Sequence, residues 1–141
     1  MVTIFDVAKY ILIETGSMSQ WKLQKLCYYS QAWHIAWGGE PLFAENFEAW
    51  TNGPVCPALR KICEMKFPIR ETDVHGDAEK LSEYERDSIN IVIGNYGEFD
   101  LYQLREISRN EKPWINAAEE GGIITKEAMK EFYSKKTFEY D

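Results

Sequence analysis

Residues 22–37, KLQKLCYYSQAWHIAW, decide the fold. On a helical wheel advancing about 100° per residue, apolar and aromatic side chains fall on two opposite sides. One side holds Leu23, Leu26, Cys27, Ser30, His34 and Trp37, and the other holds Trp21, Tyr28, Ala32 and Ile35. A helix that is apolar on two faces is normally buried between neighbouring elements. We therefore predict a central helix over about residues 20–37.

Helix start and stop signals divide the rest of the chain. Thr3 with Asp6 opens a first helix that Gly16 ends, and Ser19 caps the central helix, which runs to Gly38-Gly39. Further starts are expected at Gly53-Pro54, Ser82 with Glu85, Asp100, Pro113 and Thr125. The run Ile89 to Ile93, INIVI, would by itself suit a strand as well as a helix.

Residues 40–53 are aromatic but broken by Pro and Gly, and indicate a long ordered loop or a short hairpin. The chain has no repeat and no low-complexity linker, and 141 residues suffice for one core. We predict an all-α, compact single-domain bundle of about six to seven helices that spans residues 1–141.

Charge and composition narrow the class of protein. A net charge of −7 and an isoelectric point near 4.9 argue against binding to nucleic acid, which needs clustered Lys and Arg. The excess of Asp and Glu over Lys and Arg lies in the second half of the chain. We expect these acidic residues to form either a solvated face or a surface that attracts a basic partner. Asp6, Lys9 and Glu14 interrupt the first apolar run, which suits neither a signal peptide nor a membrane span. With three Cys and no dense framework, these features predict a cytoplasmic protein with no membrane contact.

The Cys and His residues do not form a recognisable catalytic or metal site. Cys27 and His34 lie seven residues apart, roughly 10 Å along a helix, which is too far for a nucleophile and its base. The same spacing excludes a disulfide between Cys56 and Cys63 inside an intact helix. A zinc site built from Cys27, Cys56, Cys63, His34 or His75 stays an alternative, but no CxxC or HxxxH spacing supports it. We therefore expect no catalytic residue, no cofactor and no metal.

Three stretches in order carry a family resemblance: KLQKLCYYSQAWHIAW, PLFAENFEAWTNGPVCPALR and NYGEFDLYQLREISRNEKPW. Together they resemble the Panacea domain family, also known as SocA-like or phage-associated GepA-like proteins. The resemblance implies an all-helical antitoxin that binds a cognate toxin protein, encoded by a neighbouring gene, and neutralises it directly. One branch of the family instead acts as an adaptor that delivers its toxin to a bacterial protease. A small enzyme of unrecognised type is the remaining alternative.

The motif residues fall into two groups. Those expected to be structural are Leu23, Gln24, Lys25, Leu26, Tyr28, Tyr29, Trp33, Pro54, Val55 and Pro113, with Gly53-Pro54 setting the turn into the third helix. Those expected to bind the partner are Trp50, Asn52, Gly53, Arg109 and Trp114, because Trp and Arg are favoured anchors at interfaces. Burial in the core or in loop packing is the alternative for the tryptophans.

One pair of residues departs from the family pattern. Ser108-Arg109 stands where the family usually has Thr-His. Arg keeps a hydrogen-bond donor but is permanently charged, so a role that needs a titrating ring is lost here.

Overall fold

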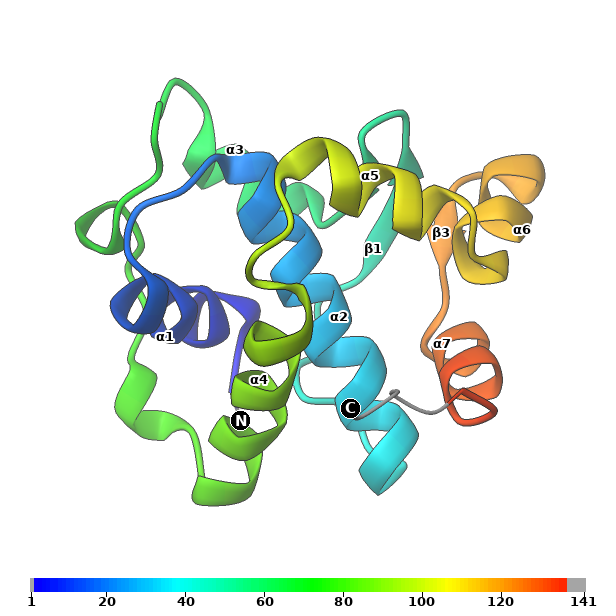
Figure 1. Ribbon diagram of the computed structural model, residues 1–141, viewed down its shortest axis with the longest axis horizontal. Coiled ribbons are helices and arrows are strands. Elements are labelled where there is room, and N and C mark those ends of the chain that lie inside the picture. The colour runs from blue at the N-terminus through cyan, green and yellow to red at the C-terminus, as the bar shows by residue number, and fades with distance from the viewer. Residues whose placement is uncertain (1, 137–141) are drawn as a thin grey trace.

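Helix α2, Gln20–Gly38, forms the centre of the protein, as predicted. In the computed structural model, which describes residues 2–136, α2 runs diagonally between the other elements (Figure 1). Fourteen of its nineteen residues are buried, so neighbours cover it on every side. The other α-helices are α1 Ile4–Thr15, α3 Pro57–Cys63, α4 Glu83–Tyr96, α5 Leu101–Arg109, α6 Lys112–Glu120 and α7 Lys126–Tyr133; two short 3₁₀ helices cover Glu71–Asp73 and Ala78–Lys80.

The predicted helix starts at Thr3, Ser19, Ser82, Asp100 and Thr125 are confirmed. Each of these side chains accepts a hydrogen bond from a backbone N–H of the first helical turn, which satisfies one of the otherwise unpaired donors there. The INIVI run is helical and lies within α4.

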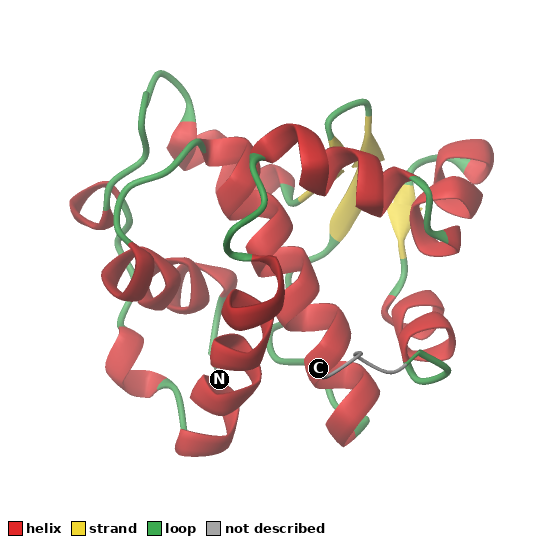
Figure 2. Ribbon diagram, in the orientation of Figure 1, coloured by secondary structure: helices red, strands yellow, loops and turns green. Residues whose placement is uncertain are grey.

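The prediction of an all-α fold is wrong in one respect, because a small antiparallel sheet lies beside α2 and α6. Its strands are β1 Phe47–Trp50, β2 Gly53–Val55 and β3 Ile123–Ile124, in the order β2-β1-β3 (Figure 2). Phe47 pairs with Ile124, and both side chains are buried. The aromatic segment 40–53 is therefore partly a hairpin, and its third strand comes from a distant part of the chain.

The predicted helix start at Gly53-Pro54 is also wrong. Gly53 has a φ of +99°, a conformation that glycine adopts without strain, and it begins β2 directly after the turn at Thr51 and Asn52. Pro54 lies on β2, an edge strand of the sheet, and pairs with Ala49 of β1. A missing backbone N–H is tolerated on an edge strand. Helix α3 begins three residues later, with Pro57 in its first turn.

Buried glutamines on α2 fasten the irregular segments to the centre. The Gln24 amide accepts a hydrogen bond from the Cys56 backbone N–H at 2.8 Å and donates to its carbonyl at 3.1 Å. Gln31 accepts from the Leu42 N–H at 2.7 Å and donates to the Phe43 carbonyl at 2.7 Å. Each amide thus satisfies backbone groups that would otherwise be buried and unpaired.

Candidate functional site

The β1–β2 hairpin and the corner between α5 and α6 lie in direct contact. The indole Nε1 of Trp114 donates a hydrogen bond to the backbone carbonyl of Trp50 at 3.0 Å. The Arg109 guanidinium lies over the Trp114 ring, 5.1 Å from its centroid, at a distance suited to a cation–π interaction. Trp50, Asn52, Arg109 and Trp114 are each half-buried, so part of each is accessible at the surface.

Gly53 on β2 lies in close contact with side chains of α2 and α5. A Cβ at this position would lie 2.7 Å from Cε of Lys25 and 2.9 Å from Oγ of Ser108. Gly53 is itself buried, and so are Pro54, Val55 and Pro113. The glycine therefore allows close packing and offers no side chain for contact.

Ser108 and Arg109, the pair that departs from the family pattern, point in different directions. The Ser108 hydroxyl is buried and donates to the Leu104 carbonyl at 2.8 Å, within its own helix. Arg109 reaches the surface beside Trp114, while its buried Nε has no hydrogen-bond partner among residues 2–136. The serine hence supports packing under Gly53, and the arginine is the accessible member of the pair.

Lys25, Arg60, Arg105 and Arg109, which we call the basic cluster, each have a buried nitrogen without a hydrogen-bond partner in the described part of the chain. Lys25 is 1% exposed. Burial, together with the nearby charge of Arg105, lowers the pKa of Lys25 to about 7. The amine is thus partly neutral at neutral pH.

A second group of buried polar residues, which we call the tyrosine cluster, surrounds Glu111. The Glu111 carboxylate accepts hydrogen bonds from the hydroxyls of Tyr29 at 2.7 Å and Tyr133 at 2.8 Å, and pairs with Lys136 at 3.1 Å. Tyr96 stacks on Tyr29 with ring centroids 4.0 Å apart, and its hydroxyl accepts from Trp33. Tyr28 completes the cluster through a 3.2 Å contact with the Tyr133 hydroxyl.

Burial raises the pKa of the hydroxyl of Tyr28, Tyr29, Tyr96 and Tyr133. These hydroxyls therefore stay protonated and act as hydrogen-bond donors or acceptors in the core. Tyr28, Tyr29 and Trp33 are buried.

The three cysteines have the properties of core residues. Cys27, Cys56 and Cys63 are free and buried, and burial raises the pKa of each thiol, to about 11 for Cys63. A protonated thiol is a poor nucleophile and a poor metal ligand. Over residues 2–136, no three His, Cys, Asp or Glu side chains are arranged to hold a metal ion. His34 is engaged with the Ser88 hydroxyl at 2.9 Å, and burial lowers its pKa.

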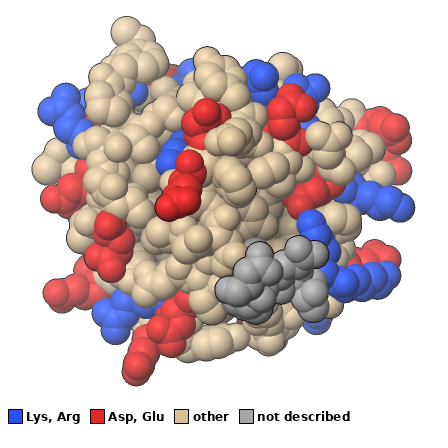
Figure 3. All heavy atoms as spheres, in the orientation of Figure 1, with Lys and Arg blue, Asp and Glu red and all other residues tan. Residues whose placement is uncertain are grey.

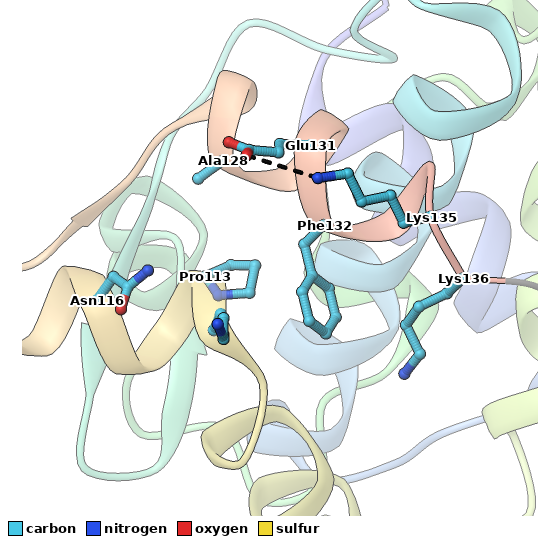
Figure 4. A pocket seen from close by; sticks show the side chains of 8 residues that line it. Pro113, Asn116, Ala128, Glu131, Phe132, Lys135 and Lys136 are labelled. Carbon is cyan, nitrogen blue, oxygen red and sulfur yellow. Dashed lines mark ion pairs between the residues drawn. The ribbon is translucent and has the colours of Figure 1, made fainter.

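A pocket of about 470 Å³ lies between α6 and α7, and its lining includes Lys136, the ion-pair partner of Glu111. Figure 4 shows the Phe132 ring extending from α7 into the space beside Pro113, with Lys135 and Lys136 in the segment that follows α7. Glu131 is paired with Lys135 at 3.8 Å. The lining contains three lysines, Lys112, Lys135 and Lys136, and no Cys or His.

Comparison with protein families decides the relationship. A family model described as antitoxin SocA-like, Panacea domain, matches residues 23–115. The chain belongs to this family. The Panacea match begins in α2 and ends in α6, so it includes Lys25, Gly53, Arg109 and Trp114. Panacea membership suggests a role in a toxin–antitoxin system, and the family is typically non-enzymatic. Neither a curated protein nor a solved structure matches the chain.

Several residues of these two clusters were not singled out from the sequence. Arg105 precedes Arg109 by one helical turn, and this i, i+4 spacing on α5 could have indicated a shared face. Glu111 precedes Pro113 at a helix start, but nothing local indicates that two tyrosines will reach it. Tyr133 lies beyond the Panacea match, and no sequence signal connects it to Tyr29.

Proposed function

We propose that this protein is an antitoxin that neutralises a cognate protein toxin by direct binding, in the cytoplasm. Its membership of the Panacea domain family over residues 23–115 is the observation that supports this most. The toxin is expected to be encoded by a neighbouring gene. Within residues 2–136, no helix combines the length and apolar character needed to cross a membrane.

The surface around Trp50 and Trp114 is the proposed toxin-binding site. Tryptophan and arginine contribute most often to the binding energy of protein interfaces. The hydrogen bond from Trp114 to the backbone carbonyl of Trp50 and the contact with Arg109 hold the Trp114 side chain in place before binding. The Trp50 indole is held by its hydrogen bond to Glu48 at 2.9 Å. Side chains that are already ordered lose less conformational entropy on association, which favours affinity.

Direct neutralisation is favoured over a chemical mechanism by the state of the nucleophilic groups. The thiols are buried with raised pKa, and the buried tyrosines hydrogen-bond within the core. Inhibition by occupying a surface of the toxin requires no reactive group on the antitoxin.

Co-expression tests this proposal. A strain that expresses the neighbouring reading frame alone should stop growing, and expression of this protein should restore growth. Trp50→Ala should weaken the rescue, since it removes an anchor but keeps the backbone carbonyl that Trp114 uses. Trp37→Ala is the matched control, because Trp37 is a partly exposed tryptophan near the other end of α2.

The outcomes separate the alternatives. Rescue by wild type and by Trp37→Ala, with weaker rescue by Trp50→Ala, would support the proposed site. Equal rescue by all three proteins would mean that the toxin binds elsewhere on the molecule. No rescue by wild type, although the two proteins are co-expressed, would contradict the antitoxin function.

A further inference from the structure

The basic cluster contains most of the buried side-chain nitrogen and oxygen atoms that lack a hydrogen bond among residues 2–136. Among residues 2–136, five buried side-chain atoms lack a hydrogen bond: Oε1 of Gln20, Nζ of Lys25, Nη1 of Arg60, Nε of Arg105 and Nε of Arg109. Four of these are nitrogens of basic residues. Buried polar groups in folded proteins are nearly always paired, so a group of unpaired donors of one charge needs a physical explanation.

These residues come from three elements that meet beside β2. On α2 and α3, Lys25 and Arg60 both lie against the Trp21 ring, at 5.6 Å and 5.2 Å from its centroid. The charge of Arg105 on α5 acts on Lys25. Arg109 follows Arg105 by one helical turn and lies on the same face of α5.

No carboxylate of the described chain neutralises Lys25, Arg105 or Arg109. The protein has 23 acidic and 16 basic residues, and other basic side chains, such as Lys136 with Glu111, do form ion pairs. Arg60 has only an exposed partner, Glu64, at 3.9 Å. Over the face seen in Figure 3, acidic and basic side chains are interspersed and neither kind forms a continuous patch. A scarcity of carboxylates in the molecule therefore cannot explain the unpaired cluster.

We propose that Lys25, Arg105 and Arg109 form a receptor for a carboxylate of the toxin. In the complex, the toxin carboxylate then supplies the negative charge that the described part of this chain does not place beside these three residues. This inference rests on the proposed antitoxin function and specifies the chemistry of the toxin surface that binds. Charge-assisted hydrogen bonds from lysine and arginine to a carboxylate are among the stronger polar interactions at interfaces.

The surroundings favour a protein carboxylate over a phosphate or nucleic acid. Trp21 lies beside the cluster. Arg109 lies over the ring of Trp114, which donates a hydrogen bond to the backbone carbonyl of Trp50. Such aromatic residues are typical of protein interfaces. A net charge of −7 opposes the approach of a polyanion but has less effect on a single side chain.

Lys25 is almost fully buried, so a toxin side chain reaches its amine only if neighbouring side chains move. Trp21 and Arg105 are only half-buried, whereas the alkyl chain of Lys25 is held beneath Gly53. Changes of side-chain rotamer at an interface are common when partners bind. We therefore expect the Trp21 and Arg105 side chains to change rotamer when the toxin carboxylate reaches the amine.

Lys25→Met tests the inference, because stability and binding should change in opposite directions. Methionine fills similar space without a charge, so the melting temperature should rise. Binding to the purified product of the neighbouring reading frame should weaken at least tenfold, since its carboxylate would lose its main partner. Arg86→Gln, which changes the charge of an exposed residue on α4, is the control and should leave both quantities unchanged.

A double-mutant cycle identifies the bound group. One Asp→Asn or Glu→Gln variant of the toxin should weaken binding to wild type as much as Lys25→Met does. That variant should have little further effect on binding to Lys25→Met, which is the non-additivity expected of contacting residues. Independently, inorganic phosphate is added to the antitoxin alone. Phosphate that stabilises wild type but not Lys25→Met would show that the site binds phosphate and would overturn the carboxylate assignment.

The remaining outcomes are distinct. If wild type binds the toxin and Lys25→Met binds equally well, the carboxylate receptor is wrong while the antitoxin function stands. If Lys25→Met loses both stability and binding, Lys25 is a structural residue and the receptor is again wrong. If wild type does not bind the neighbouring gene product, the antitoxin function fails and this inference fails with it.

Discussion

The basic cluster and the tyrosine cluster each include a buried polar residue of α2, Lys25 and Tyr29, which lie one helical turn apart, yet the two clusters are built in opposite ways. In the tyrosine cluster, the Tyr29 and Tyr133 hydroxyls meet the Glu111 carboxylate at 2.7 Å and 2.8 Å. In the basic cluster, Lys25, four residues before Tyr29, has no hydrogen-bond partner among residues 2–136. Paired polar groups fix a unique packing, whereas unpaired ones lower stability. We infer that the first cluster maintains the fold and the second is reserved for a partner.

The largest effect on stability is expected for Tyr29→Ala. The substitution removes a fully buried ring stacked on Tyr96 and one donor to Glu111, so unfolding should become easier by about 4 kcal/mol. Denaturant unfolding measures this. Tyr29→Phe keeps the ring and should cost only about 1 kcal/mol. Equal losses for the two variants would mean that the hydroxyl network, not packing, dominates this region.

A smaller effect of pH is expected for Lys25. Its pKa is about 7 in the folded protein and near 10.5 when unfolded, so between these values the unfolded chain binds more protons. Stability from this group should therefore rise with pH above 7, by about 2 kcal/mol between pH 7 and 9. The difference in unfolding free energy between wild type and Lys25→Met isolates this contribution, since other titrating groups are common to both. A pH-independent difference would contradict an uncompensated buried amine.

The smallest change in stability is expected for Arg109→Ala. Arg109 is half-buried and contacts Trp114 at the surface, so the free energy of unfolding should change by less than about 0.5 kcal/mol. Toxin binding should weaken by about 1–2 kcal/mol, or roughly tenfold, as for an interface anchor. Calorimetric titration and a thermal melt on the same preparation give both values. A large loss of melting temperature would instead assign Arg109 to the fold.

The helices could be predicted from the sequence because their signals are local. Thr3, Ser82 and Asp100 cap helices through hydrogen bonds that span three residues, and these are visible in the order of residues alone. The sheet could not be predicted in the same way. Its strands are two to four residues long, and β3 at Ile123–Ile124 pairs with a strand more than seventy residues earlier in the chain. The prediction of a helix start at Gly53-Pro54 is wrong for a related reason, since a proline is also tolerated on an edge strand, and only the folded sheet shows that β2 is one.

The candidate site was partly accessible to sequence reasoning. Residue type and motif indicate Trp50, Arg109 and Trp114 as candidates, and the structure places Trp114 in contact with the other two. The lack of a hydrogen-bond partner for the Lys25 amine could not be predicted from the sequence. It depends on which side chains of α2, α3 and α5 surround the amine in the folded protein. Absence of a partner is a property of the folded arrangement and has no signature in a single segment.

The most direct test of the antitoxin proposal is a titration of toxin activity in a purified mixture without proteases. We expect activity to fall in proportion to added antitoxin and to reach background at equal molar amounts, with Arg109→Ala requiring a higher concentration. Full toxin activity in the presence of a stable complex would favour delivery to a protease over direct neutralisation. Full activity with no complex at saturating antitoxin would contradict the account.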